Sequence, residues 1–226
     1  MIKKLFLIAS FLFLIVAISC AQKNKVSYLA LGDSYTIGES VPEKLRWPVQ
    51  LAEQLNISGF SVAKPNIIAT TGWTTNELQD AIIKEDPATD YDLVSLLIGV
   101  NNQYRGYPIN QYKKEFKELL KKAISFADGK PERVFVVSIP NYGVTPFGMK
   151  KGEDRIRNEL LIYDAIADSI SSEFNIPFIN ITPISEKAKT DASYIAPDQL
   201  HPSGKQYSEW VDLILPRVKK ILNSSK

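Results

Sequence analysis

Cysteine and histidine are almost absent from this sequence, and each absence narrows the chemistry that the chain can carry out. Among 226 residues there is one cysteine, Cys20, and one histidine, His201. A lone cysteine excludes an intramolecular disulfide. A lone histidine argues against a metal-dependent phosphoesterase, because such sites usually combine several imidazoles with carboxylates. We therefore expect no metal and no other cofactor.

The chain also lacks an excess of charge of either sign. Its 27 lysines and arginines are balanced by 25 aspartates and glutamates, which leaves a formal net charge of +2. There is no basic tail and no patch in which basic and aromatic residues alternate, so nucleic acid is not an expected partner. The lysines of residues 110–127 are interleaved with glutamates and indicate a solvated helix face.

A long hydrophobic run is missing as well. The apolar run Leu5–Ile18 follows two lysines and is shorter than the about 20 residues that a membrane-spanning helix needs. It ends in Ala17-Ile18-Ser19-Cys20, which resembles a bacterial lipoprotein signal. We expect residues 1–19 to be a lipoprotein-type signal peptide, with Cys20 acylated and the protein exported as a periplasmic or outer-membrane-anchored lipoprotein. An ordinary cleaved signal peptide is the alternative.

After residue 25, short apolar runs alternate with amphipathic segments. The run 91–98 has almost no polar face, which is typical of a strand covered on both sides. The segments between the runs carry apolar residues at helical spacing. Strands are predicted at 26–31, 61–69, 91–98, 133–139 and 176–181, and helices at 46–55, 75–84, 110–127, 153–174 and after Pro202, the last kinked by Pro216.

This alternation predicts an α/β fold: a three-layer α/β/α sandwich with a five-stranded parallel sheet and flavodoxin-like topology. A chain of 226 residues with 45% hydrophobic content can bury one sizeable core but is short for two full domains. We therefore expect residues 20–226 to form one domain. Residues 99–108 and 140–152 are predicted to be loops.

Polar residues and glycines follow four of the predicted strands. Ser34 follows the first strand, Gly72 the second and Asn101 the third, and Asp198 with His201 follows the fifth. The carboxyl ends of parallel strands share one edge of the sheet, where sites form in such folds. A serine becomes a nucleophile when a neighbouring base takes its proton, and imidazole suits that task near neutral pH. Asp198, three residues before His201, is close enough to hold the ring.

These residues lie in motifs that resemble those of the SGNH, or GDSL-type, hydrolase family. Its blocks match Gly32-Asp33-Ser34-Tyr35, Gly72, Gly99-Val100-Asn101-Asn102 and Asp198-Gln199-Leu200-His201-Pro202. The resemblance implies a serine esterase in which Ser34 is the nucleophile, His201 the base and Asp198 the acid. It also implies an oxyanion hole made by the backbone N–H groups of Ser34 and Gly72 and the side-chain amide of Asn101.

Two departures accompany the resemblance. Asn102 stands where the family's third block often has aspartate, and we expect the change to affect loop electrostatics more than activity. Thr36 stands where the second glycine of a Gly-x-Ser-x-Gly elbow would be, which argues against an ordinary α/β-hydrolase. Asp33 is expected to bond backbone amides near the turn rather than to act as a second acid.

The substrate is expected to be a carboxylic ester with a short acyl chain or an acetylated glycan. A lysophospholipase or thioesterase acting on longer chains is the alternative, for which Val144, Phe147 and Met149 could form an apolar trough. A surface lipoprotein that only binds glycan or lipid is the alternative of another class. Five aromatic residues could line a cleft, Tyr104 and Tyr107 before the others: Trp47, Trp73, Tyr104, Tyr107 and Tyr142. Nothing in the sequence indicates the oligomeric state.

Overall fold

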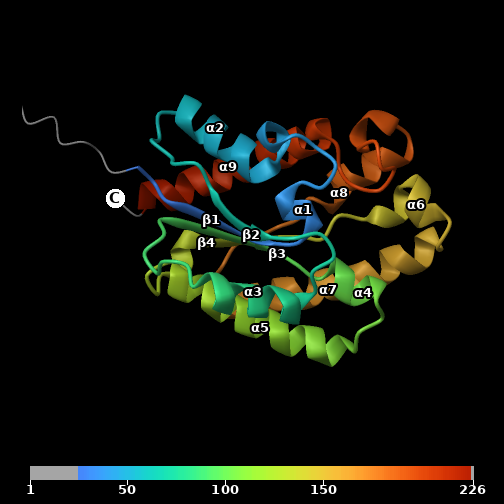
Figure 1. Cartoon of the computed structure of the whole chain (residues 1–226), viewed down its shortest axis with the longest axis horizontal. Helices are drawn as coiled ribbons and strands as arrows, with labels where there is room; N and C mark the ends of the chain where they lie inside the picture. The colour runs from blue at the N-terminus through green and yellow to red at the C-terminus, as the bar shows by residue number, and fades with distance from the viewer. Residues whose placement is uncertain (1–24, 225–226) are drawn as a thin grey trace, which may run out of the picture.

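A five-stranded sheet forms the centre of the protein (Figure 1). The computed structural model describes residues 25–224, so the predicted signal peptide and Cys20 lie outside the described residues. All strand pairs are parallel, and the order is β2-β1-β3-β4-β5, as in flavodoxin-like folds. The strands are β1 (Tyr28–Gly32), β2 (Asn66–Ala69), β3 (Leu93–Leu97), β4 (Val134–Val137) and β5 (Phe178–Ile179).

The apolar runs of the sequence form the inner strands. Every residue of β1, β3 and β4 is buried, because helices cover both faces of the sheet. The register places Leu31 beside Ile68 of β2 on one side and beside Leu96 of β3 on the other. The five-stranded parallel sheet predicted from the sequence is confirmed.

Helices form a layer on each face of the sheet. In Figure 1, α2 and α9 lie above the sheet and α3, α5 and α7 lie below it. The predicted three-layer sandwich is therefore confirmed. The main helices are α2 (Trp47–Ile57), α3 (Thr75–Glu85), α5 (Ile109–Phe126), α7 (Glu153–Glu173) and α9 (Gly204–Ser224), and the short ones are α1 (Ser34–Ile37), α4 (Val100–Tyr104), α6 (Pro146–Met149) and α8 (Thr182–Ser185).

The two outer strands are shorter than the sequence indicates. In the predicted strand 61–69, Val62 makes only an isolated bridge with Val26, and β2 begins at Asn66. The predicted strand 176–181 is limited to Phe178–Ile179. A proline precedes each strand, Pro65 and Pro177, and proline has no N–H for a ladder hydrogen bond. These edges are therefore short.

Both predicted loops contain helical turns. Residues 99–108 include α4, and residues 140–152 include a 3₁₀ turn (Tyr142–Val144) and α6. Thr145 caps α6 by accepting from the N–H of Gly148, and Pro146 occupies the first turn. α9 continues past Pro216 to Ser224. Within residues 25–224, no helix combines the length and apolar character needed to cross a bilayer.

Candidate active site

The turn after β1 places Ser34 at the first position of α1. Asp33 is the N-cap residue, and its Oδ1 accepts from the backbone N–H of Tyr35 at 3.0 Å. A Cβ on Gly32 would lie 2.2 Å from Thr36 Oγ1 and 2.5 Å from the carbonyl oxygen of Leu97, so only glycine fits this turn. Asp33 therefore has the amide-bonding role that the sequence suggested.

Burial also changes the ionisation of Asp33. Its carboxyl is fully buried, and the second oxygen, Oδ2, has no hydrogen-bond partner among residues 25–224. Burial raises the pKa of Asp33 to about 7, although the N–H of Tyr35 favours the charged form. Asp33 is thus far easier to protonate than an exposed aspartate.

Asp198 and His201 form a close pair in the loop before α9. Asp198 Oδ2 lies 2.6 Å from His201 Nδ1, and Asp198 Oδ1 accepts from the backbone N–H groups of Leu200 (3.0 Å) and His201 (2.9 Å). The loop is closed by a hydrogen bond of 2.8 Å from the N–H of Ala196 to the carbonyl oxygen of His201. A carboxylate on Nδ1 fixes the ring and leaves Nε2 available.

A residue that sequence reasoning missed supports this pair. The hydroxyl of Ser40, held in the left-handed backbone region at φ 63°, donates to Asp198 Oδ2 at 2.7 Å. Partial burial alone would raise the pKa of Asp198. The hydrogen bonds from His201, Leu200 and Ser40 outweigh that effect and lower the pKa to about 2, so the carboxylate is ionised at neutral pH. A serine in a surface turn carries no sequence signal for such a contact.

Four distant segments meet around one cavity of about 220 Å³. Ser34, Gly72, Asn101 and His201 all line it, each from the segment that was expected to reach this edge of the sheet. Among residues 25–224, neither Ser34 Oγ nor His201 Nε2 has a hydrogen-bond partner, so no hydrogen bond joins them in this structure. The other lining residues are Tyr35, Thr71, Val100, Tyr104, Tyr142, Phe147 and Leu200.

The loop that carries Gly72 is held from two sides. Asn101 Nδ2 donates to the carbonyl oxygen of Trp73 at 2.9 Å, and Arg105 Nη2 donates to the carbonyl oxygen of Gly72 at 2.6 Å. Arg105 Nη1 also pairs with Glu77 at 3.1 Å. An amide nitrogen carries two hydrogens, so Asn101 keeps one donor free. Arg105, whose role the sequence did not reveal, holds the loop through its hydrogen bond to the carbonyl oxygen of Gly72.

Asn102 lies beneath this loop and is fully buried. Its Oδ1 accepts from the backbone N–H of Thr75 at 3.0 Å, and its Nδ2 lies 2.7 Å from Thr75 Oγ1. The Thr75 hydroxyl in turn donates to Glu115. Asn102 therefore ties α4 to the start of α3, which agrees with a loop-supporting role.

The family of this chain follows from a comparison with known families. Residues 30–208 match the GDSL-like lipase/acylhydrolase family, which is most of the chain. The chain belongs to this family. It is therefore a hydrolase that acts on esters, and the match extends over the segments that carry Ser34 and His201.

Solved structures support the family's fold. TesA has a TM-score of 0.66 at 16% identity, with 87% of this chain and 99% of that chain covered. The acetylxylan esterase Axe2 from Geobacillus stearothermophilus has a TM-score of 0.65 at 19% identity, with coverage of 86% and 96%. The psychrotrophic esterase EstA from Pseudoalteromonas sp. has a TM-score of 0.64 at 18% identity, with coverage of 88% and 100%. A comparison with curated proteins found no match.

The aromatic candidates in this GDSL-like hydrolase separate into two groups. Tyr104 and Tyr142 line the Ser34 cavity, and Tyr104 and Tyr107 line a neighbouring groove. Trp47 is fully buried in the core, and Trp73 packs against the core. Only for Tyr104 and Tyr107 did the sequence give a reason beyond aromatic character, because both follow Asn101 closely in the chain.

The proposed apolar trough is largely wrong. Phe147 lines the Ser34 cavity, but Val144 is buried against Ala188 and Tyr194, and the side chain of Met149 is outside the cavity lining. The 3₁₀ turn and α6 rotate these three side chains in different directions, which a loop assignment could not foresee. Within residues 25–224, no group of three or more histidine, cysteine or acidic side chains is arranged to hold a metal ion.

Proposed function

We propose that this GDSL-like hydrolase cleaves carboxylic esters of short acyl groups, acetylated glycans included, with Ser34, His201 and Asp198 as a catalytic triad. The observation that carries the proposal is the 2.6 Å contact between Asp198 Oδ2 and His201 Nδ1, in a loop that brings His201 to the cavity shared with Ser34. The only histidine of the chain therefore has one nitrogen fixed by a carboxylate and the other free.

In the proposed mechanism, Ser34 Oγ attacks the ester carbonyl while His201 Nε2 takes its proton. Asp198 keeps the remaining proton on Nδ1 and stabilises the imidazolium that forms. His201 then protonates the departing alcohol, which leaves an acyl group on Ser34. Water, deprotonated by the same imidazole, hydrolyses this acyl-enzyme and restores the serine.

Three donors are proposed to stabilise the oxyanion. They are the backbone N–H groups of Ser34 and Gly72 and the free hydrogen of Asn101 Nδ2. Neither backbone N–H has an acceptor among the described hydrogen bonds of residues 25–224, and all three residues line the cavity. Donors without internal partners can act on the charge that develops in the transition state.

The size of the cavity favours short acyl groups. About 220 Å³ is less than the roughly 300–1,000 Å³ of sites that bury drug-sized ligands. Three aromatic side chains that contact one another, Tyr104, Tyr142 and Phe147, form part of its lining. A series of p-nitrophenyl esters tests this point: we expect kcat/KM to be highest for acetyl or propionyl and to fall for octanoyl.

Covalent labelling tests the nucleophile. A fluorophosphonate probe is expected to label the parent at Ser34 and to leave Ser34→Ala unlabelled, with turnover of p-nitrophenyl acetate reduced by about 10⁴-fold or more. Ser125→Ala, at an exposed serine of α5, is the matched control and should behave as the parent. A parent that binds acetylated glycan but is neither labelled nor active would indicate the non-catalytic binding protein instead.

Replacement of the acid tests the triad. Asp198→Asn is expected to lower kcat by about 10⁴-fold, because an amide stabilises the wrong imidazole tautomer. Asp191→Asn, at an acid of the same region that bonds Lys205 and Ser193, is the control and should retain activity. If the two variants were equally active, the proposed pairing of Asp198 with the base would be wrong.

We also propose that the protein is exported and tethered by a lipid on Cys20. The support is the sequence alone: a basic start, a short apolar run and a small-residue segment that ends in the single cysteine. In a bacterial host, Cys20→Ser should abolish palmitate incorporation and move the esterase from the membrane to the soluble fraction. Palmitate labelling of the Cys20→Ser variant equal to that of the parent would refute it.

A further inference from the structure

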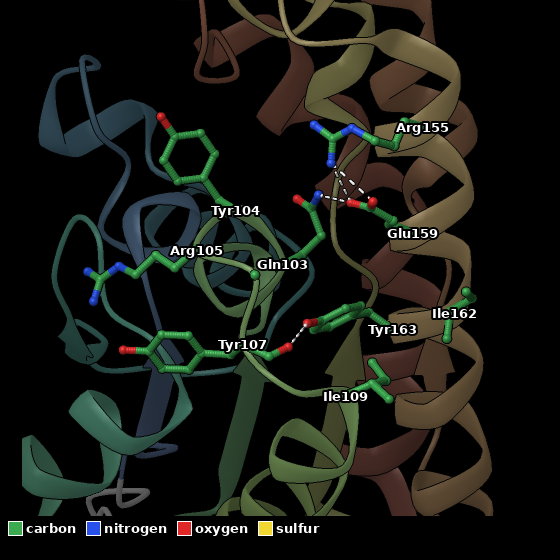
Figure 2. Close-up of a pocket in the computed structure, with 10 residues that line it drawn as sticks. Gln103, Tyr104, Arg105, Tyr107, Ile109, Arg155, Glu159, Ile162 and Tyr163 are labelled. Atoms are coloured by element: carbon green, nitrogen blue, oxygen red, sulfur yellow. Dashed lines mark hydrogen bonds and ion pairs between the residues drawn. The ribbon is translucent and has the colours of Figure 1, made fainter.

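A groove of about 470 Å³ lies beside the Ser34 cavity, more than twice its volume. One wall is the segment from Gln103 to Ile109, which follows Asn101, and the other is α7, as Figure 2 shows. Tyr104 lines both the groove and the cavity. Tyr104 is thus the side chain that the groove and the Ser34 cavity share.

The polar side chains of the groove form one connected array. Arg155 Nη1 donates to both oxygens of Glu159, at 3.0 and 2.9 Å, and Gln103 Nε2 donates to the same carboxylate (Figure 2). Tyr142, a residue of the Ser34 cavity, donates from its hydroxyl to Gln103 Oε1 at 2.9 Å. The array thus extends from the cavity into the groove and offers donors and acceptors together.

The charges of the groove are already paired. Its two arginines each hold a carboxylate: Arg155 holds Glu159, and Arg105 holds Glu77 at 3.1 Å. A phosphate bound at either guanidinium would have to compete with the carboxylate that already pairs with it. A long acyl chain would have to cover the Arg155–Glu159 pair, and removing paired charges from water is costly. Paired charges favour a neutral ligand with many hydroxyl groups, because a hydroxyl both donates and accepts.

Apolar surface lies next to this array. Ile109 and Ile162 line the groove. Ile162 is 55% exposed, and almost half of the surface of Tyr104 is exposed as well. Gly106, in the left-handed region at φ 67°, has nothing within 4 Å of a Cβ position, so the backbone there is open to a ligand. Apolar patches beside a few fixed polar groups suit a ring that is apolar on its faces and polar around its edge.

We propose that this groove binds the neutral sugar residues on the alcohol side of the scissile ester, so that the enzyme's substrate is an acetylated neutral oligosaccharide. The proposal rests on the proposed esterase function and adds to it the site that selects the alcohol. The acetyl group occupies the Ser34 cavity, and the glycan extends past Tyr104 along α7.

The test fills the groove without touching the cavity. Ile162→Trp places a large ring in the groove. Leu161→Trp is the matched control, because Leu161, the preceding residue on α7, is 53% exposed and lies outside the groove lining. A second variant, Arg155→Gln, removes a charge at an exposed position and disturbs packing less. Each variant is assayed on acetylated xylotetraose and on p-nitrophenyl acetate.

We expect the ratio of kcat/KM for the oligosaccharide to kcat/KM for p-nitrophenyl acetate to fall at least tenfold in Ile162→Trp, through KM. A fall of about threefold or more is expected in Arg155→Gln and no change in Leu161→Trp. An unchanged ratio in Ile162→Trp, or an equal fall in Leu161→Trp, would overturn the proposal.

Further outcomes separate this proposal from the esterase function itself. A parent that cleaves p-nitrophenyl acetate but not acetylated xylotetraose would overturn the glycan groove and leave the esterase intact. Selective loss of activity on lysophosphatidylcholine in Ile162→Trp would assign the groove to a lipid and overturn the proposal in that way. A parent that is inactive on every ester and unlabelled by fluorophosphonate would refute the esterase function.

Discussion

Asn102→Asp restores the aspartate that is common in this position of the family, and we expect it to destabilise this protein. In the structure, two hydrogen bonds run in one direction: Asn102 Nδ2 donates to Thr75 Oγ1, and the Thr75 hydroxyl donates to Glu115. Aspartate replaces the Nδ2 donor by an acceptor oxygen. The single hydrogen of Thr75 then has two carboxylates to serve, and when it stays with Glu115 the new oxygen at position 102 is buried without a partner.

The magnitude follows from that unpartnered oxygen. An unsatisfied buried acceptor costs about 1–3 kcal/mol, and more when it is charged. For a chain of this length each kcal/mol lowers Tm by about 2–4 °C, so Tm should fall by about 2–12 °C at pH 8. Burial raises the pKa of the new carboxyl, and its protonated form supplies a donor to Thr75. The loss should therefore shrink as the pH falls toward 4.

Thermal and urea unfolding at pH 8 and pH 5 measure the effect, and a second substitution tests its cause. Adding Glu115→Gln should recover at least half of the lost Tm, because the glutamine amide can donate to Thr75 Oγ1 and free its hydrogen for the new carboxylate. A variant Asn102→Asp as stable as the parent at pH 8 would refute the reasoning. So would a further loss of stability on adding Glu115→Gln.

Three other predictions concern Asn101, the contact between Arg105 and Gly72, and two buried aspartates. Asn101→Ala should lower kcat on p-nitrophenyl acetate by about 10²–10³-fold with Tm within a few degrees of the parent, and a loss below tenfold would argue against its donor role. Arg105→Met releases the carbonyl oxygen of Gly72 and should lower kcat about tenfold with little change in KM; an unchanged kcat would show that the clamp is dispensable. Burial raises the pKa of both Asp33 and Asp164 to about 7, so the fold binds more protons than the unfolded chain between about pH 4 and 7, and stability should decline as the pH rises through that window. Asp33→Asn should remove about half of this decline in urea unfolding, and an identical slope would contradict the assignment.

The inner sheet was predictable because its residues leave few alternatives. A run such as Leu93–Leu97, apolar except for Ser95, is stable only between two covering layers, so burial, strand type and parallel pairing follow together. The outer strands were overestimated, since apolar content says nothing about pairing at an edge. Pro65 and Pro177 mark where β2 and β5 begin, and both were visible in the sequence.

The candidate site also contains some residues whose positions were predictable from the sequence and others whose positions were not. The positions of Ser34 and of the Asp198–His201 pair were predictable because each depends on its own short segment. Ser40 and Arg105 were not, since their partners lie 158 and 33 residues away in the chain and depend on tertiary packing. A polar side chain in a surface turn is too common to predict such a contact.

The parallel direction of the strands has a consequence for how the enzyme meets its substrate. The described chain enters at the amino end of β1, on the left of Figure 1, while α4 and α6 beside the cavity lie on the right. The five residues of β1 alone place the amino end of this strand about 17 Å from its carboxyl end, where the cavity lies. A lipid on Cys20, as we propose, would then anchor the molecule at the amino end of β1, with the Ser34 cavity facing away from the bilayer. Such an orientation would favour water-soluble polymers over lipids still embedded in the membrane.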